Sequence, residues 1–288
     1  MIFFSLFEQG SSVFSFEFFL PKNPQEDASF KSTVRELKSL NPSFVTLTYG
    51  AGGSDKDRTL EMAGALKNEI GIETAAHLTC ITHTRPEIQD ILRRIRSMRI
   101  ENIVALRGDP PKDGSAQSPQ KRDYRHAKDL VTDIRNYGEF CVGVAGYPEG
   151  HPEGPSLRKD ILHLKEKLEA GGQWVITQLF FKNKDYFDFV NRCRSAGIRA
   201  PIVPGIMPIT SFRQIQRFTS LCGAHLPEDM IRTLQPVQDD KKAVTLFGIE
   251  YAFLQCKQLL ENGAPGIHFY TLNKSHSTQE ILRRLRKL

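Results

Sequence analysis

The chain has few cysteines and no long apolar run, and each shortage argues against a class of protein. Its five cysteines are scattered, and none belongs to a C-x-x-C pair, so we expect reduced thiols in a cytoplasmic protein. No apolar run reaches the length of a transmembrane helix, and the aromatic N-terminus lacks the basic residues that begin a signal peptide. Low-complexity linkers and internal repeats are also missing. We therefore predict a single domain over residues 1–288.

The net charge is +6, a balance that could favour nucleic acid, anionic lipid or small anionic ligands. The basic residues concentrate at 93–99 and 283–287. In the first stretch they interleave with apolar residues at helical spacing, which is typical of the solvated face of a helix. We therefore expect no nucleic acid and no membrane as partners, which leaves small anions.

Eight short runs rich in β-branched, aromatic or small apolar residues recur along the chain, and each is a candidate strand. Segments with helical periodicity separate them, and this alternation is typical of βαβ units in a parallel sheet. Eight such units predict an α/β fold of the closed (β/α)8, or TIM-barrel, type. The longest connection, at about 211–262, is interpreted as a helical insertion before the last strand. The candidate strands span 14–19, 44–49, 74–80, 102–109, 141–147, 174–181, 202–209 and 266–272.

Several helix ends can also be predicted. Ser54 with Asp57 and Thr84 with Glu87 match the capping-box pattern, and Ser156 can cap the helix that follows it. Glycines stand where these helices should stop, for example at Gly71.

Active sites of such barrels lie at the C-terminal ends of the strands, so polar residues there are candidates. Glu17 stands in the first strand among phenylalanines (FSFEFF). Burial would raise the pKa of this carboxyl and suit it to donate a proton near neutral pH. The alternative is a structural carboxylate paired with an arginine or a lysine.

The fourth and sixth strands also end in polar residues. Arg107 and Asp109 are two residues apart, which places them on one strand face, and Gly108 permits a close backbone approach. The pair could hold an anion and a hydrogen-bonding heterocycle, or form an ion pair that closes the barrel mouth. Gln178 lies in an apolar run and needs hydrogen-bond partners, either in a ligand or in the protein.

A loop at 147–154 (YPEGHPEG) leads to a helix on which Asp160, His163 and Lys167 share one face. By themselves these three residues would form a solvated polar stripe. Beside Tyr147 and His151 they could instead clasp a nucleotide.

Two other motifs are weaker indications of a functional site. His77-x-x-Cys80-x-x-His83 has metal-like spacing, but alternation along a strand points His77 and Cys80 to opposite faces, and no fourth ligand is close in sequence, so we predict no metal. The glycine-rich segment 49–54 matches neither a dinucleotide motif nor a P-loop. We interpret it as a loop that opens onto a helix N-terminus, which can still receive a phosphate.

Taken together, the strand-end segments closely resemble the methylenetetrahydrofolate reductase family, in the bacterial form that consists of the catalytic barrel alone. They follow the family's order over nearly the whole chain. The segments are FSFEFFLPK (14–22), TLTYG (46–50), HLTC (77–80), ALRGD (105–109), YPEGHPE (147–153), ITQLFF (176–181), PGIMP (204–208) and HFYTLNK (268–274).

The resemblance implies a non-covalently bound FAD that takes a hydride from NADH or NADPH. In a ping-pong reaction the hydride then passes to 5,10-methylenetetrahydrofolate, which becomes 5-methyltetrahydrofolate for one-carbon metabolism and methionine supply. It also implies a homo-oligomer without a domain that binds S-adenosylmethionine. The preference between NADH and NADPH stays open, as does a ferredoxin or a partner subunit as electron donor. All these ligands are anions, which agrees with the positive net charge.

The family's site residues carry over by motif. Glu17 matches the general acid that assists opening of the folate's imidazolidine ring, Asp109 the residue near flavin and pterin, and Gln178 a contact to folate and nicotinamide. Members often have Tyr, Asn and Arg where this chain has His126, His163 and Lys274. Further matches to substrate or nicotinamide contacts are Thr48, Gln214, Phe218 and Lys274, although Gln214 also fits a capping box with Ser211. Matches to FAD contacts are Tyr49, Ala51, His77, Arg107, Gly108, Asp109, Ala127, Tyr147, His151, Gly154, Asp160, His163 and Lys167.

Two other functions stay open. The same polar barrel mouth would suit a pterin-binding methyltransferase, which would bind folate without flavin. A non-catalytic barrel that binds a nucleotide or another protein is the alternative from a different class, and in it the replacement of Glu17 by Gln would change nothing measurable.

Overall fold

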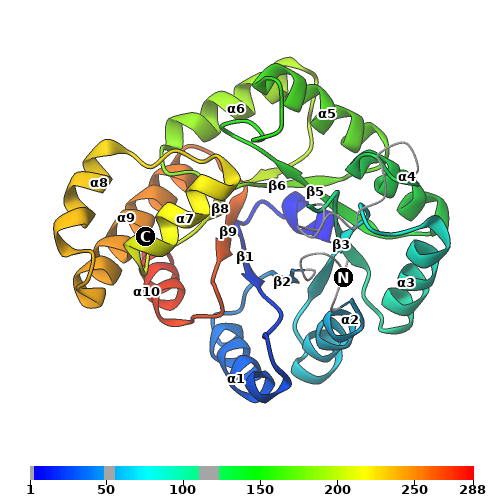
Figure 1. Cartoon of the computed structure of the whole chain (residues 1–288), viewed down its shortest axis with the longest axis horizontal. Helices are drawn as coiled ribbons and strands as arrows, with labels where there is room; N and C mark the ends of the chain where they lie inside the picture. The colour runs from blue at the N-terminus through cyan, green and yellow to red at the C-terminus, as the bar shows by residue number, and fades with distance from the viewer. Residues whose placement is uncertain (1–2, 49–55, 110–122) are drawn as a thin grey trace.

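The computed structural model describes residues 3–48, 56–109 and 123–288. Within these ranges nine strands form one parallel sheet in the order β7-β6-β5-β4-β3-β2-β1-β9-β8. The strands stand in a ring with helices outside it, which makes a nearly closed barrel (Figure 1). The predicted TIM-barrel fold is therefore confirmed. The strands are β1 (Val13–Phe18), β2 (Phe44–Leu47), β3 (Thr74–Thr79), β4 (Asn102–Leu106), β5 (Cys141–Gly146), β6 (Trp174–Thr177), β7 (Ile202–Val203), β8 (Gly205–Ile206) and β9 (Gly266–Tyr270).

The seventh predicted strand is observed as two short ones, β7 and β8, which lie on either side of Pro204. Proline has no amide hydrogen to donate, so it interrupts the ladder. β7 pairs with β6, whereas β8 pairs with β9. The carbonyl oxygen of Pro204 itself accepts a hydrogen bond from the amide of His268, at 3.0 Å. The barrel thus closes through one segment that is interrupted at Pro204, and its two short strands pair with different neighbouring strands.

Helices follow most of the strands, as βαβ units require. Three of them, α7 to α9, lie between β8 and β9, in the range predicted to hold an insertion. No helix in the described ranges is long and apolar enough to cross a membrane. The helices are α1 (Asp27–Lys38), α2 (Lys56–Ala65), α3 (Arg85–Ser97), α4 (Ala127–Tyr137), α5 (Leu157–Glu169), α6 (Asn183–Ser195), α7 (Phe212–Cys222), α8 (Glu228–Leu234), α9 (Lys241–Glu261) and α10 (His276–Leu285), with short turns η1 (Phe3–Glu8), η2 (Pro24–Glu26), η4 (Leu66–Ile70) and η6 (Gln235–Val237).

The helix ends agree with their predicted signals where these are described. Thr84 and Glu87 form the capping box of α3, in which the Thr84 amide donates to the Glu87 carboxylate at 2.8 Å. The Ser156 hydroxyl accepts a hydrogen bond from the amide of Lys159 at the start of α5. Gly71 ends the η4 turn with a φ of 71°, a conformation that favours glycine. Ser54 lies outside the described residues.

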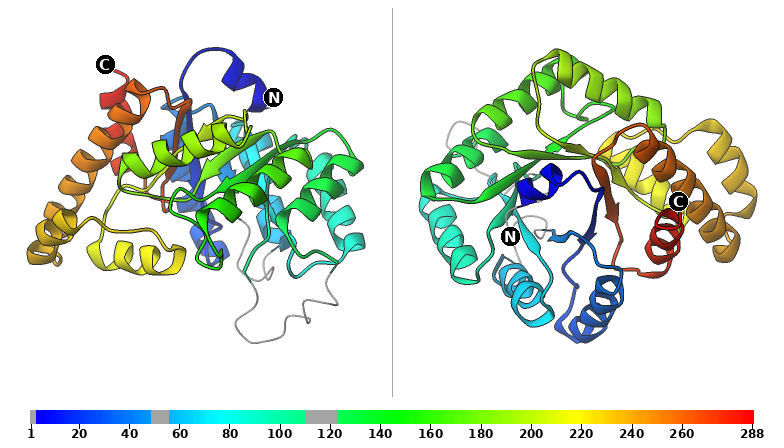
Figure 2. Two further views of the ribbon diagram at one scale, coloured as in Figure 1. Left: turned by 90° about the horizontal axis from the view of Figure 1, so that it is seen from above. Right: turned by 180° about the vertical axis from the view of Figure 1, so that it is seen from behind.

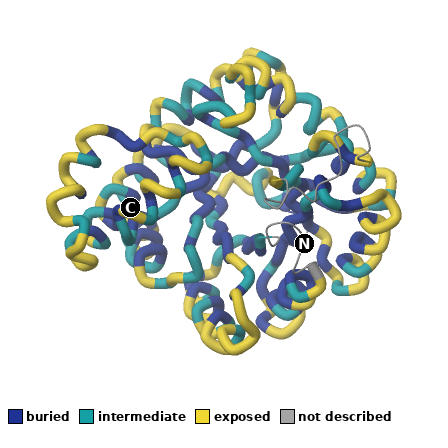
Figure 3. The backbone as a smooth tube through the Cα atoms, viewed as in Figure 1, coloured by how far each residue is buried: buried dark blue, intermediate teal, exposed yellow. Residues whose placement is uncertain are grey.

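Strand side chains alternate between the helices and the barrel interior. On β1, Phe16 and Phe18 belong to the main core between strands and helices, while Ser15 and Glu17 on the other face are buried polar residues. The strands accordingly form the most buried part of the molecule, and the outer faces of the helices are exposed (Figure 3). This alternation is why a carboxyl among phenylalanines points into the barrel.

The N-terminal turn η1 lies across one end of the barrel (Figure 2). Its Phe3 is fully buried and stacks on Phe44 of β2, with ring centroids 3.9 Å apart. Phe3 also approaches Trp174 of β6, and its amide donates to the side chain of Asn102 at the start of β4. An aromatic plug therefore closes the barrel at the N-terminal ends of its strands, opposite the end where an active site is expected.

Candidate active site

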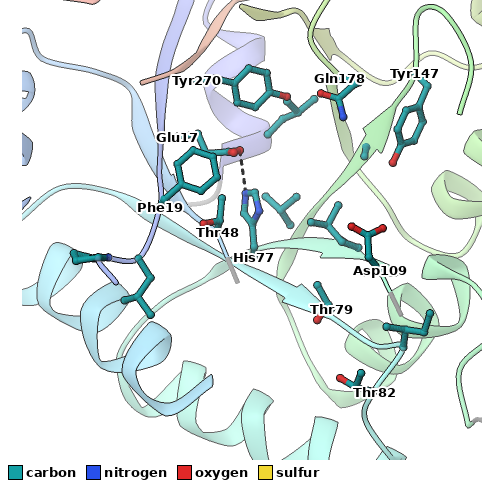
Figure 4. A pocket seen from close by; sticks show the side chains of 18 of the residues that line it. Glu17, Phe19, Thr48, His77, Thr79, Thr82, Asp109, Tyr147, Gln178 and Tyr270 are labelled. Atoms are coloured by element: carbon teal, nitrogen blue, oxygen red, sulfur yellow. Dashed lines mark ion pairs between the residues drawn. The ribbon is translucent and has the colours of Figure 1, made fainter. Parts of the chain in front are cut away.

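Two adjoining pockets open at the C-terminal ends of the strands. The larger, here called the central pocket, has a volume of about 670 Å³ and is lined from the ends of β1, β3, β4, β5, β6 and β9 (Figure 4). The smaller, the side pocket, has a volume of about 210 Å³ and lies between the ends of β4 and β5 and the helices α4 and α5. Leu106, Ala145 and Tyr147 line both pockets. The two therefore form one elongated site.

Most of the predicted site residues lie in these pockets. Seven of them line the central pocket: Glu17, Thr48, His77, Gly108, Asp109, Tyr147 and Gln178. Eight line the side pocket: Arg107, Ala127, Tyr147, His151, Gly154, Asp160, His163 and Lys167. Sequence reasoning thus brought together residues from strands that are far apart in the chain.

Three predicted residues line neither pocket. Gln214 and Phe218 lie on α7, where the Gln214 amide donates to the Ser211 hydroxyl at 3.3 Å, so a capping role accounts for part of that motif. Lys274 is exposed and its ammonium donates to the Thr210 hydroxyl at 3.2 Å. Two further predicted residues, Tyr49 and Ala51, lie outside the described residues.

Glu17 is at the centre of a buried polar cluster, and its side chain is almost fully enclosed. Its Oε2 lies 3.4 Å from Nε2 of His268 and 3.5 Å from Nε2 of His77. The Thr46 hydroxyl donates to the same oxygen at 3.5 Å. The Glu17 carboxyl is therefore held by two histidines and a threonine rather than by the arginine or lysine that the structural alternative required.

The expected rise in the pKa of Glu17 is wrong in this structure. Burial does raise the pKa, as predicted, but His77 and His268 outweigh burial, and the net result is a pKa below the ordinary value. Burial also lowers the pKa of His77, against the opposing effect of Glu17. The sequence alone could not show that His77 and His268, on β3 and β9, lie beside the Glu17 carboxyl.

Arg107 and Asp109 do not share a face, contrary to the prediction. β4 ends at Leu106, and Gly108 has a φ of 82°, so the strand alternation on which the prediction relied stops before these residues. Arg107 turns into the side pocket and pairs with Glu153 at 2.7 Å, while Asp109 lines the central pocket. A Cβ on Gly108 would lie 2.9 Å from the Thr79 side chain, so the close approach here needs glycine.

The face of α5 that carries Asp160, His163 and Lys167 lies against the side pocket. The Lys167 ammonium donates to the carbonyl oxygen of Ala145 at 2.5 Å, and burial lowers its pKa to about 8. Asp160 accepts a hydrogen bond from the amide of His151 at 2.8 Å, which orders the loop after β5. The interpretation as a solvated stripe is therefore wrong for Asp160 and Lys167.

Three residues of this region were not among the predicted site residues. His268 and Tyr270 of β9 belong to the segment HFYTLNK, but only their inward direction makes them part of the site. Glu149, in the loop after β5, accepts a hydrogen bond from the amide of His225 at 3.0 Å, and burial raises its pKa to about 7. The run of prolines and glycines around Glu149 was the available signal for a shaped loop.

The metal-like motif is divided by the strand, as alternation requires. His77 lines the central pocket, whereas the thiol of Cys80 is directed at the carbonyl oxygens of Arg107 and His126. No group of three or more potential metal ligands gathers in the described ranges.

The fold and the pockets define a (β/α)8-barrel protein with an elongated polar site at the C-terminal ends of its strands. A family model described as methylenetetrahydrofolate reductase matches residues 3–286. The chain therefore belongs to the methylenetetrahydrofolate reductase family, and the resemblance seen in the strand-end segments is confirmed.

Curated relatives agree with this assignment. The chain is 40% identical over 292 residues to "Methylenetetrahydrofolate reductase (NADH) 1" of Arabidopsis thaliana, which covers 98% of this chain and 49% of the relative. The 5,10-methylenetetrahydrofolate reductase of Escherichia coli K12 is 38% identical over 278 residues, or 96% of this chain and 92% of the relative. The chain thus spans about half the length of the plant relatives and most of the bacterial one.

A solved structure supports the fold. A protein from Clostridium thermocellum, described as binding two copies of 5-methyl-5,6,7,8-tetrahydrofolic acid, superimposes with a TM-score of 0.71. The match covers 98% of this chain and 96% of that protein at 14% identity. It therefore supports the barrel fold and gives no information on the ligands of this chain.

Proposed function

We propose that this chain catalyses the reduction of 5,10-methylenetetrahydrofolate to 5-methyltetrahydrofolate. NADH or NADPH supplies the hydride, and bound FAD carries it between the two substrates in a ping-pong reaction. The family assignment supports the folate reaction, and the plant relatives named for NADH support a nicotinamide donor. A role in methionine supply, a cytoplasmic location and a homo-oligomeric assembly belong to the same proposal.

The observation that carries the proposal is the elongated site made by the two joined pockets. FAD has a flat ring system and a nucleotide linked by a diphosphate, and the side pocket offers cationic and imidazole groups suited to the nucleotide part. Arg107 and the half-buried Lys167 line it, together with His151 and His163. A Cβ on Gly154 would collide with the Asp160 carboxylate, so glycine at this position lets Asp160 pack against the loop that borders the side pocket. The residues present fit FAD.

The central pocket suits the flavin ring and a stacked substrate. Its volume of about 670 Å³ lies within the range of ordinary ligand sites. Burial raises the pKa of Tyr147 to about 12, so its hydroxyl stays neutral where the two pockets meet. Gln178 presents an amide to the pocket, and its oxygen already accepts from the amide of Leu179 at 2.9 Å. Asp109 faces Glu17 across the pocket (Figure 4).

In this proposal FAD held in the two pockets would supply the hydride chemistry, and the chain itself supplies the proton. Glu17 gives that proton to the folate nitrogen that leaves the one-carbon unit, and regains it from solvent in each cycle. Its lowered pKa means that the carboxyl is ionised near neutral pH before substrate binds, so the proton must be taken up during the cycle. Asp109 and Gln178 orient the pterin by hydrogen bonds.

Flavin uptake is the first test of the function. Purified protein should carry FAD or take it up, and anaerobic addition of NADH or NADPH should bleach the flavin. The nicotinamide that bleaches the flavin more rapidly is the preferred electron donor. Protein that binds no flavin but binds folate would favour the methyltransferase alternative.

The role of Glu17 is tested by separating the two half-reactions. Glu17→Gln should keep flavin reduction by the nicotinamide donor, since no proton is supplied by the carboxyl in that step. Oxidation of the reduced flavin by 5,10-methylenetetrahydrofolate should fall by at least about 100-fold. A variant that retains full folate reduction would contradict the assignment of Glu17 as the acid.

A further inference from the structure

A buried serine and histidine lie behind Glu17 and continue the cluster away from the central pocket. Ser15 stands two residues before Glu17 on the same inward face of β1, and the strand register places it opposite His268 of β9. Its Oγ lies 2.8 Å from Nδ1 of His268, whose Nε2 lies 3.4 Å from Oε2 of Glu17. Ser15 and His268 are completely buried. The three side chains form a chain of contacts that ends at the carboxyl.

The imidazole ring of His268 is held in place from two sides. It is stacked with Phe44, with ring centroids 6.4 Å apart, and it meets Tyr270 edge to face at 5.5 Å. Burial on all sides leaves no room for the ring to turn freely. The ring nitrogens therefore keep their assigned neighbours, Nδ1 towards Ser15 and Nε2 towards Glu17.

The tautomer of His268 follows from these neighbours. A serine hydroxyl can donate to Nδ1, which leaves the ring proton on Nε2, where it can be donated to a carboxylate. The opposite tautomer would set the lone pair of Nε2 against the oxygen of Glu17, which repels it. The lowered pKa of Glu17, to which the hydrogen bond from His268 contributes, agrees with donation from Nε2.

Three close contacts that the described residues make with the Glu17 carboxyl converge on one oxygen. His268, His77 and Thr46 approach Oε2 from β9, β3 and β2, respectively. A carboxylic acid whose one oxygen accepts hydrogen bonds carries its own proton best on the other oxygen. Oε1 is accordingly the atom from which a proton can move into the pocket.

We propose that Ser15 and His268 are positioning residues for the proposed reaction. Ser15 fixes the tautomer of His268, and His268 pins Oε2 of Glu17, so that Oε1 holds the proton that is given to the folate. In that step the Oε1–H bond breaks, an N–H bond forms on the leaving nitrogen of the folate, and the bond from this nitrogen to the one-carbon unit breaks. The carboxylate that remains is stabilised by the Nε2–H of His268. The inference rests on the proposed function.

Two amides distinguish the two nitrogens of His268. The side-chain amide of Gln can place an N–H near the position of Nε2, whereas the shorter Asn reaches only the position of Nδ1. In FAD-loaded protein reduced anaerobically by NADH, His268→Asn should slow reoxidation by 5,10-methylenetetrahydrofolate by roughly 10- to 100-fold. His268→Gln should stay within about threefold of the unchanged protein, and flavin reduction by NADH should stay within about twofold in both.

The pH dependence of the folate half-reaction distinguishes positioning residues from purely structural ones, because loss of a purely structural residue would not shift it. Among the described residues, the groups close to or electrostatically coupled to Glu17 are Thr46, His77, His268 and Tyr270, and Asp109 faces it from the other side of the central pocket. Loss of the hydrogen bond from His268 raises the pKa of Glu17, so the carboxyl keeps its proton to higher pH. In Ser15→Ala and His268→Asn the alkaline limb of the folate half-reaction should therefore move up by about one pH unit. His276→Asn, on the exposed start of α10, is the matched control and should leave the limb in place.

The outcomes separate the two proposals. If the unchanged protein reduces folate while Ser15→Ala and His268→Asn keep its rate and pH profile, or slow both half-reactions equally, the positioning proposal is overturned and the function stands. If the unchanged protein binds no flavin or does not react with folate, the proposed function fails first. Should His268→Asn not fold, the pH profile of Ser15→Ala alone decides.

Discussion

Glu149 should make the stability of the barrel depend on pH. One carboxyl oxygen accepts a hydrogen bond from the amide of His225, and the other is buried with no hydrogen-bond partner among the described residues. Burial, reinforced by Asp185 and opposed by the His225 amide and by Lys182, raises its pKa from 4.5 to about 7. The folded protein therefore holds a proton that the unfolded chain has already released between these two values. Stability contributed by this group falls as the pH rises through that window.

The magnitude follows from the two values. A difference from 4.5 to about 7 corresponds to roughly 3 kcal/mol. Because the side chain is only partly buried, screening by solvent reduces this to about 1 kcal/mol. Glu149→Gln keeps an oxygen for the His225 amide and removes the charge. The variant should therefore match the unchanged protein at pH 5 and be more stable at pH 8 by about 1 kcal/mol, or about 2 °C in Tm.

Thermal unfolding followed by circular dichroism at pH 5 and pH 8 measures this difference. Glu139→Gln removes an exposed carboxyl just before β5, at the opposite end of that strand from Glu149, and serves as the control. A gain in stability that is equal at both pH values, or a loss at pH 8, would refute the assignment of a buried proton to Glu149.

Three further outcomes are expected. Phe3→Ala should lower the free energy of unfolding by about 3–5 kcal/mol in denaturant titrations because it removes a fully buried ring from the plug; a loss below about 1 kcal/mol would show that the barrel does not depend on the plug. Gly108→Ala should cost about 1–2 kcal/mol from its φ of 82° alone, and contact with Thr79 should also weaken FAD binding measured by fluorescence titration. Lys167→Gln should weaken FAD binding by at least about tenfold, whereas Lys159→Gln on the exposed side of α5 should not; equal affinities would remove Lys167 from the nucleotide site.

The sequence predicts the architecture well because local signals agree with each other. The periods of strands and helices and the caps at Thr84 and Ser156 need no knowledge of distant contacts. The split at Pro204 was missed because a short apolar run does not reveal that its two halves pair with different neighbours. A proline within the run was the signal that could have indicated it.

Prediction of the site was limited in a different way. Residues at strand ends could be assigned to one end of the barrel, which brought Glu17, Asp109 and Gln178 together correctly. The pKa of Glu17 depends on neighbours from other strands, so the effect of His268 could not be weighed against that of burial from the sequence alone. Alternation failed at Arg107 because the strand had already ended before it.

Trp174, the sole tryptophan of the chain, gives this barrel a built-in optical probe. Its indole is fully buried against Phe3 and Phe44, and a Cβ on Gly143 would lie only 2.5 Å from it. An indole in such dry, rigid surroundings emits at short wavelength, and the emission overlaps the absorption of a flavin. The emission wavelength of Trp174 can therefore report whether the aromatic plug is intact. Quenching of the same emission by energy transfer can report flavin binding at the opposite end of the barrel.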